Sequence, residues 1–291
     1  MKRLIHARDR LAVASRLVPA TLPGQMLLWL TAVTAYCLVL VATARAIPYA
    51  TAAISLILPA ALYAAQSVDF AWRRIRQLFL ITSYFMLVAT ISIFAIMSGY
   101  DGINRYAGYL FFIYFGLQSL GFVLHEIKKR SVLGIVSTIG CGSAIVLWGV
   151  SLGGWGSIID AEGRFQMWGE NAPLLIQGIY FFWVIRVLLE SRTLPKLTEL
   201  SAHTASILIA LLSGQFFFVR LLTASQLFLL DGIARYSSRD FVSPGFMAFD
   251  EVREARFRSI YRRYISPTFF AILAVLVLLA WWDSATQLGL F

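Results

Sequence analysis

The sequence predicts an all-α, polytopic integral membrane protein: a bundle of apolar helices within a lipid bilayer. Eight stretches of about 20 apolar residues run along the chain, and a helix needs about 20 residues to cross a hydrocarbon core about 30 Å thick. Only 14% of the 291 residues are charged, against roughly 25% in soluble domains. The hydrophilic stretches are short, so we expect no separate catalytic or nucleic-acid-binding domain.

The first residues of the chain are basic and have a partly apolar side. We predict that residues 1–24 form a short interfacial helix lying on the membrane, or alternatively a flank whose charges only orient the chain. The first strong apolar run begins near Gln25 without a clear small-residue cleavage site, so we expect no cleavable signal peptide.

The apolar segments then follow one another closely. We predict a transmembrane bundle over 25–230 and a last span with a C-terminal tail over 265–291. The eight segments are 25–43, 46–65, 77–98, 106–124, 132–153, 171–190, 204–230 and 265–283. In the fifth segment, small residues at spacings of three and four would let a neighbouring helix approach closely, so we expect it at the bundle centre. These residues are Gly134, Ser137, Gly140, Cys141 and Ala144.

Basic residues in alternate loops predict the orientation of the chain. Cytoplasmic loops of membrane proteins carry an excess of Lys and Arg. Such residues cluster at Arg73, Arg74 and Arg76, at Lys128, Lys129 and Arg130, and at Arg192 and Lys196. We therefore predict a cytoplasmic N-terminus and a location in the inner (plasma) membrane. Arginine far outnumbers lysine, which favours a bacterial source. The opposite loop contains Trp155 and Trp168, which we expect in the outer interface.

The segment 204–230 leaves the number of crossings open at seven or eight. Seven crossings before residues 231–264 would place that loop outside, yet it holds seven arginines. Either the outer loop is unusually basic, or 204–230 breaks near Gly214 and re-enters, which puts 231–264 in the cytoplasm. We favour the second interpretation. We expect 231–264 to be a basic amphipathic loop with a helix over 246–264 that rests on anionic headgroups and leads into the last span.

Arg220 is the most costly residue in the sequence. It lies deep in an apolar segment, where an arginine costs at least about 2.5 to 3.5 kcal/mol on insertion scales. We expect it to face the bundle interior, either as part of a substrate or ion site or as a structural anchor. The polar residues expected near it are Gln118, Gln177, Gln215 and Gln226. Arg186, one turn from the end of its segment, is interpreted as a snorkelling side chain.

A stretch of 24 residues is similar to a family signature. Asp231-Gly232-Ile233-Ala234-Arg235, followed by Gly245, Asp250 and Glu254, resembles the CDP-alcohol phosphotransferase signature D-x-x-D-G-x-x-A-R. The resemblance implies carboxylates that bind divalent metals and activate a CDP-linked lipid headgroup. The sequence departs from that pattern, since Phe228 occupies the first Asp position and one residue is missing before Arg235. The alternative interpretation assigns no catalytic role to these residues. It is a solvated loop in which Asp231 and Arg235 form an i,i+4 ion pair.

The remaining reactive side chains do not predict a cofactor or metal site. His6, His125 and His203 are scattered along the chain, and we interpret His125 and His203 as solvated interface residues. Cys37 and Cys141 fall inside apolar segments, where a thiol acts as a small hydrophobic group. We expect no cofactor and no bound metal.

The leading functional hypothesis is a non-enzymatic membrane component. It is either a transporter of a small solute or lipid, or the integral subunit of a larger membrane complex. We expect its partners to be anionic lipid headgroups and other membrane or cytoplasmic subunits, not nucleic acid. One alternative is a membrane-embedded enzyme acting on a lipid-linked substrate through Asp231, Arg235, Asp250 and Glu254. Another is a sensor whose output domain lies on a separate chain.

Overall fold

A computed structural model describes residues 21–46, 57, 72–152, 155–190, 197–236 and 251–290 of the chain. The helices of this part are α2 (Leu22–Ala46), α4 (Trp72–Met97), α5 (Asp101–Lys129), α6 (Val132–Ser151), α7 (Leu174–Leu189), α8 (Leu197–Ser213), α9 (Phe216–Tyr236), α10 (Glu251–Ile260) and α11 (Ser266–Gln287). A small antiparallel hairpin, β1 (Ile158–Ile159) with β2 (Phe165–Gln166), and the 3₁₀ turn η1 (Met167–Gly169) join α6 to α7.

The described part is a helical membrane bundle, as the composition predicted. Five of its helices are long and apolar enough to cross a bilayer. They cover Leu22–Ala46, Leu80–Met97, Asp101–Lys129, Val132–Ser151 and Ala255–Gln287. The prediction of eight spanning segments is not supported by these residues. Segment 171–190 contains the 16-residue α7, 204–230 is not one helix, and most of 46–65 lies outside the described residues.

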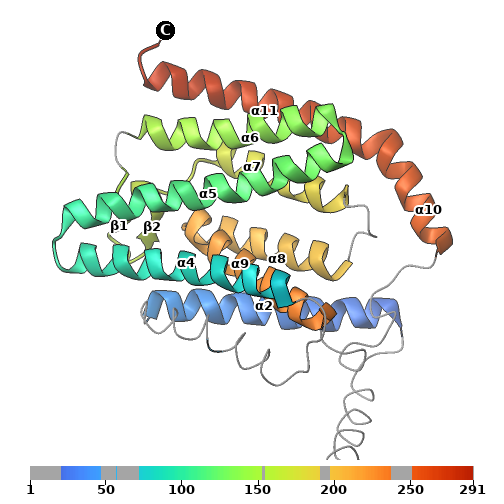
Figure 1. Cartoon of the computed structure of the whole chain (residues 1–291), viewed down its shortest axis with the longest axis horizontal. Coiled ribbons are helices and arrows are strands. Elements are labelled where there is room, and N and C mark those ends of the chain that lie inside the picture. Colours follow the sequence, from blue (N-terminus) through green and yellow to red (C-terminus); the bar gives the residue numbers. More distant parts are fainter. Residues whose placement is uncertain are drawn as a thin grey trace, which may run out of the picture.

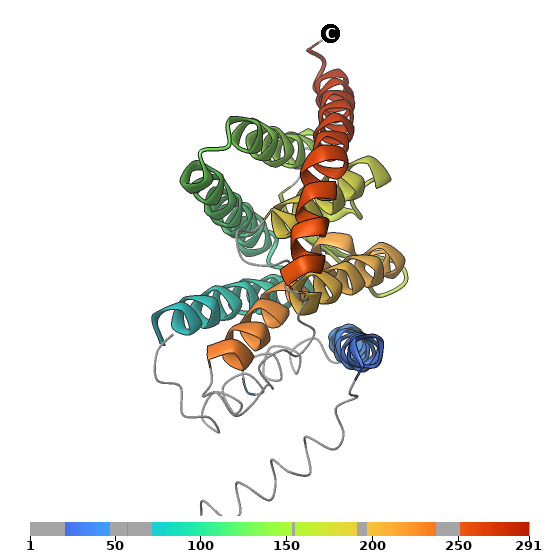
Figure 2. The ribbon, with the colours of Figure 1, turned by 90° about the vertical axis from the view of Figure 1, so that its right-hand side faces the viewer.

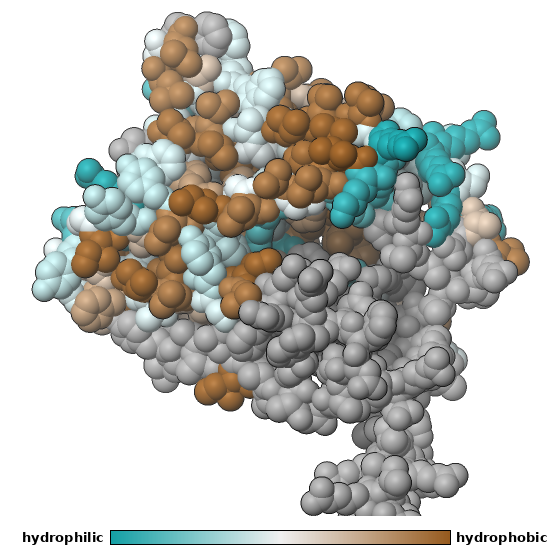
Figure 3. Space-filling view, viewed as in Figure 1, coloured by the Kyte–Doolittle hydropathy of each residue, from teal (hydrophilic) through white to brown (hydrophobic). Residues whose placement is uncertain are grey.

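The helices lie lengthwise beside one another, so the bundle has two ends (Figure 1). We call the end with β1 and β2 the strand end, and the end with the α5–α6 turn and α10 the basic end. Large apolar side chains cover the outside, as Leu117, Val136 and Leu278 show with exposed fractions of 62%, 63% and 62%. Such a surface is suited to lipid. Figure 3 shows hydrophobic residues over the middle and hydrophilic ones gathered at the basic end.

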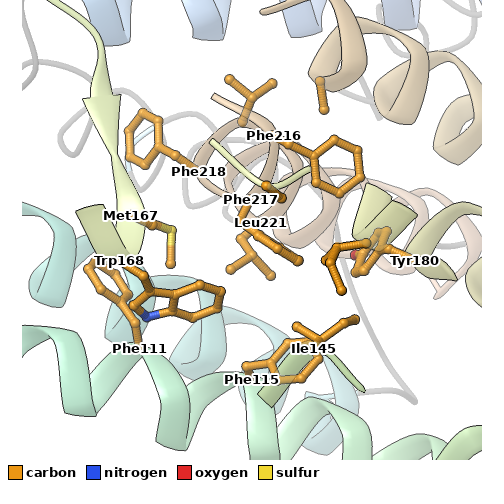
Figure 4. Packing of buried hydrophobic residues seen from close by; sticks show 14 of the residues in the cluster. Phe111, Phe115, Ile145, Met167, Trp168, Tyr180, Phe216, Phe217, Phe218 and Leu221 are labelled. Atoms are coloured by element: carbon orange, nitrogen blue, oxygen red, sulfur yellow. The ribbon is translucent and has the colours of Figure 1, made fainter. Parts of the chain in front are cut away.

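The core is built around the first half of α9, which other helices enclose. Every residue of Phe216–Leu222 is buried, and Figure 4 shows Phe216, Phe217, Phe218 and Leu221 packed against residues from α5, α6, α7 and η1. Helix α6 is not central, contrary to the sequence prediction, because Val136 and Ile139 face outward. Its small residues nevertheless serve close packing: a side chain at Gly140 would meet Val277 of α11.

A tight turn at Gly214 divides the segment 204–230 into α8 and α9, which pack against each other. Gly214 has φ +68°, a conformation that side-chain-bearing residues rarely adopt. Its carbonyl accepts a hydrogen bond from Gln166 of β2 at 2.6 Å, and Arg45 donates to the carbonyl of Ser213 at 2.7 Å. The turn therefore lies at the strand end, and α9 returns the chain to the basic end. The sequence allowed for this return as two half-helices, and the hairpin consists of the 17-residue α8 and the 21-residue α9.

Helices α10 and α11 form one continuous helix. A π-helical turn, η2 (Tyr261–Ile265), joins them, and Pro267 sits in the first turn of α11, where a helix tolerates it. Figure 2 shows α10 descending from the start of α11 across the basic end. Val252 and Ile260 of this helix are exposed at 80% and 42%. The amphipathic helix expected over 246–264 stays a prediction, since residues 246–250 lie outside the described residues.

Candidate functional site

The first candidate site is the central arginine cluster: Arg220 with Tyr180, His203, Ser206 and Thr223. Arg220 Nη1 donates to Ser206 Oγ at 2.9 Å, and Nη2 lies 2.8 Å from His203 Nδ1. The guanidinium carbon lies 5.6 Å from the centre of the Tyr180 ring. Arg220, His203 and Ser206 are at most 1% exposed. The prediction that Arg220 faces the bundle interior is therefore correct.

Three helices supply this cluster, and helical spacing explains the arrangement. His203 and Ser206 lie three residues apart on one face of α8, and Arg220 and Thr223 lie three apart on the facing side of α9. The Ser206 and Thr223 hydroxyls are 2.6 Å apart, which ties the two helices together. Tyr180 comes from α7. The turn at Gly214 sets the two polar pairs at similar depths.

The partners of Arg220 among the described side chains are uncharged. A guanidinium has only donors, so His203 Nδ1 accepts the hydrogen bond and the imidazole is neutral. Among the described side chains, no carboxylate lies within ion-pair distance of Arg220, and its Nε has no hydrogen-bond partner there. The cluster therefore holds one net positive charge in the bundle interior.

The glutamines expected around Arg220 serve other parts of the bundle. Gln215 donates to the carbonyl of Phe165 at 3.3 Å in the turn before α9. Gln177 donates to the carbonyl of Ala172 at the start of α7. Gln118 bonds the Tyr114 hydroxyl at 3.0 Å, and Gln226 accepts from Tyr36 of α2 at 2.9 Å. They organise turns and helix contacts and do not complete an arginine site.

The second candidate site is the basic-end network: Glu126, Lys129, Arg186 and Glu190. Arg186 Nη1 lies 2.7 Å from Glu190 Oε2 and 3.4 Å from Glu126 Oε1, and Nη2 donates to Thr138 at 3.0 Å. Arg186 is fully buried, so its interpretation as a snorkelling side chain is wrong. It is retained inside because two carboxylates compensate its charge.

The side chains of this network are closely packed against their neighbours. Glu126 is fully buried, and a side chain at Gly134 of α6 would collide with its carboxylate. Tyr261 and Ser266 each donate to Glu190 Oε1 at 3.2 Å, which links the network to η2 and α11. Two carboxylates and two cations make the network electrically neutral, in contrast to the central arginine cluster.

The described residues of the phosphotransferase resemblance lie on α9 and α10, near the basic end. Asp231 and Arg235 are one turn apart on α9, and Glu254 is on α10, but the placement of these side chains is not described. Asp250 lies outside the described residues. Within the ranges that are described, no group of three His, Cys, Asp or Glu side chains could hold a metal ion.

Two further sequence interpretations are corrected by burial. His203 was expected to be a solvated interface residue, but it is 1% exposed because it supports Arg220. Trp168 was expected in the outer interface, but it is 1% exposed and stacks on Phe112 with ring centres 4.3 Å apart. In the sequence both residues lie just before a predicted apolar segment, 171–190 or 204–230. Packing between distant segments, which the sequence pattern does not specify, encloses them.

A third polar group lies in the strand-end loop and is partly solvated. Asp160 accepts hydrogen bonds from Gln166 Nε2 at 3.0 Å and from Arg164 Nε at 2.7 Å. Burial opposes ionisation of Asp160, but the hydrogen bonds from Gln166 and Arg164 outweigh it and lower its pKa to about 2. The loop is thereby held against the α8–α9 turn through Gln166.

Comparisons of this chain with protein families, with curated proteins and with solved structures found no match.

Proposed function

We propose that the protein is a non-enzymatic, multi-pass transporter that binds a small anionic solute at Arg220. The single observation behind this proposal is the net positive charge of the central arginine cluster. An arginine inside a membrane protein normally faces a partner charge or a water-filled path. Here its described partners are neutral, so a negatively charged solute would supply the missing counter-charge.

The guanidinium of Arg220, rather than the hydroxyls beside it, supports anion recognition. Thr223 Oγ1 donates to the carbonyl of Val219 at 2.7 Å, and Ser206 Oγ lies 2.6 Å from Thr223 Oγ1, so both hydroxyl protons are engaged. Nε of Arg220 has no hydrogen-bond partner among the described side chains. The guanidinium itself forms charge-assisted hydrogen bonds with carboxylates and phosphates. The cluster joins α7, α8 and α9, so a bound anion would lie next to three helices.

Anion-dependent currents in proteoliposomes test this function. The purified protein would be exposed on supported membranes to jumps of chloride, sulfate, phosphate and acetate. We expect a current with at least one of these anions, which Arg220→Gln reduces at least tenfold and Arg256→Gln, an exposed residue of α10, leaves unchanged. A wild-type protein silent to all four anions, or a fully active Arg220→Gln variant, would overturn the proposal.

The proposed orientation places the N-terminus and the basic end in the cytoplasm of a bacterial inner membrane. The support is the excess of Lys and Arg at the basic end. Single cysteines at positions 162 and 256 test it, because Glu162 and Arg256 are exposed at opposite ends. Membrane-impermeant thiol reagents should label position 162 from outside and position 256 from inside. The reverse labelling pattern would show that the basic end lies outside the cytoplasm.

A second candidate function is that of an integral subunit in a larger membrane complex. The observation favouring it is the exposed surface of α10 and η2, where Val252 and Ile260 accompany Arg256 and Arg262. Such a mixed surface suits an acidic partner chain. Purification in mild detergent should then retain a stoichiometric partner that Val252→Asp removes. A monodisperse single chain that is unaffected by the substitution would exclude this candidate.

A further inference from the structure

A cavity of about 290 Å³ opens at the basic end, beside the network of Glu126, Lys129, Arg186 and Glu190. Its walls combine two chemistries. Lys129, Arg258 and Arg262 contribute positive charge, whereas Leu133, Phe257 and Phe270 contribute apolar surface. The volume is close to the lower limit of small-molecule sites. Three cations in the lining of one cavity predict an anionic occupant.

Lys129 supplies an ammonium group to this cavity that is ion-paired but has unused hydrogen-bond donors. Its ammonium lies 3.7 Å from Glu126 Oε1 and 3.9 Å from Glu190 Oε2, which are ion-pair distances too long for hydrogen bonds. The ammonium has no hydrogen-bond partner among the described residues, although its side chain is only 11% exposed. An anion in the cavity would accept the hydrogen bonds that these carboxylates do not.

Glu190 also lines the cavity, but its charge is already engaged. Arg186 lies 2.7 Å from one carboxylate oxygen, while the Tyr261 and Ser266 hydroxyls donate to the other at 3.2 Å. Glu190 therefore repels an anion less than an unpaired carboxylate would. Arg258 and Arg262 line the same cavity and add positive charge, which attracts an anion.

The apolar wall continues onto the outer surface of the bundle. Leu133 is 65% exposed, and its neighbours Val132 and Val136 on α6 are exposed at 72% and 63%. In Figure 3, hydrophobic residues reach the hydrophilic group at this end of the molecule. A ligand with a charged head and a hydrocarbon tail fits this continuity, whereas a free inorganic ion would leave the apolar wall without a partner.

We infer that this cavity binds the phosphate headgroup of an anionic membrane lipid, with Lys129, Arg258 and Arg262 around the phosphate and the acyl chains along α6. Basic pockets between membrane helices are suited to such headgroups. The site is separate from Arg220 and does not depend on the proposed anion transport. It lies where α10 and α11 are joined, so a bound lipid would contact both of these helices and the α5–α6 turn.

A charge-matched pair of variants tests the inference. Arg258→Gln with Arg262→Gln removes two cavity arginines, whereas Arg256→Gln with Arg263→Gln removes two arginines that do not line the cavity. Both variants lose the same charge from the same end of one continuous helix. The purified wild type and both variants, in neutral detergent, would be titrated with phosphatidylglycerol, phosphatidylcholine or inorganic phosphate, and bound lipid would be counted by native mass spectrometry.

We expect the cavity variant to bind phosphatidylglycerol at least tenfold more weakly than the wild type, and the matched variant to change less than threefold. Phosphatidylcholine should bind more weakly than phosphatidylglycerol, and millimolar phosphate should not displace the lipid. Equal losses in the two variants would show diffuse charge attraction and overturn the site. Efficient displacement by inorganic phosphate would identify a free-anion site instead. Unfolding midpoints without lipid confirm that both variants fold.

Discussion

Two buried arginines of the described bundle differ in whether a carboxylate compensates their charge. Arg186, near the basic end, has Glu190 at 2.7 Å and Glu126 at 3.4 Å and belongs to a neutral network. Arg220, enclosed in the core, has a neutral imidazole and hydroxyls as partners. Burial alone therefore does not distinguish a structural from a functional arginine. We expect the charge balance around the guanidinium to distinguish them, because removing one partner of a buried ion pair leaves an uncompensated charge.

The largest expected effect follows from removing the compensated arginine. Arg186→Met leaves Glu126 buried without its cation, and breaking a buried pair in this way costs about 3–5 kcal/mol. Unfolding by dodecyl sulfate titration in mixed micelles measures the loss. Arg186→Met combined with Glu126→Gln should recover part of it, because the second change removes the stranded charge. A double variant as unstable as the sum of the two single variants would contradict the pairing.

A smaller effect is expected at the turn that aligns the central arginine cluster. Gly214 has φ +68°, and a left-handed conformation costs an ordinary residue about 1–2 kcal/mol. A Cβ there would also lie 2.7 Å from Arg164 Nη1, although that side chain can move. Gly214→Ala should therefore destabilise the protein by about 1–2 kcal/mol in the same titration. Gly163 also has a positive φ but is exposed and lies outside the α8–α9 turn. Gly163→Ala therefore measures the cost of backbone strain alone.

Removing the uncompensated arginine should cost still less stability. Arg220→Met loses the hydrogen bonds to Ser206 and His203 but also relieves the desolvation of a buried charge. We expect a change of less than about 1 kcal/mol in the free energy of unfolding. The comparison fails if Arg220→Met destabilises the bundle as strongly as Arg186→Met, since Arg220 would then be a structural anchor.

The smallest effect concerns the partly solvated Asp160. Its pKa of about 2 lies below the ordinary value of 3.8, so the ionised form stabilises the folded loop. This stabilisation is present above about pH 4 and is lost as the pH falls towards 2. The unfolding midpoint of the wild type should therefore decrease over this range more than that of Asp160→Asn. Identical pH profiles for the wild type and Asp160→Asn would show that the Asp160 hydrogen bonds do not stabilise the loop.

The sequence predicted the class of the protein well and the sites only in part. Apolar length identified the membrane helices because it depends on single segments. It also singled out Arg220, whose cost is evident from its neighbours in the chain. It missed His203, Ser206 and Tyr180 as partners, because which helices meet and which faces they turn inward are decided by packing between distant segments. One signal was available: polar pairs at 203/206 and 220/223 flank Gly214 at similar separations, as a hairpin requires.

Arg186 shows a second reason why the sequence predicted the sites only in part. Its position one turn from the helix end made a solvated head plausible, and its i+4 partner Glu190 could have been noted. Glu126, however, is 60 residues away in the chain, and it enters the network only because Gly134 lets the α5–α6 turn close tightly. Pairings of this kind require the fold to be known first.

The enclosed position of α9 has a consequence for how the chain is assembled in the membrane. This helix is made late, after α2 and α4 to α7, yet it occupies the middle of the finished bundle. An isolated helix carrying Arg220 would enter the bilayer at a substantial energetic cost. The hydrogen-bond partners His203 and Ser206 lie on α8, the segment synthesised immediately before it. The α8–α9 hairpin can thus satisfy its own arginine during insertion, and enter as a pair the space that the earlier helices leave open.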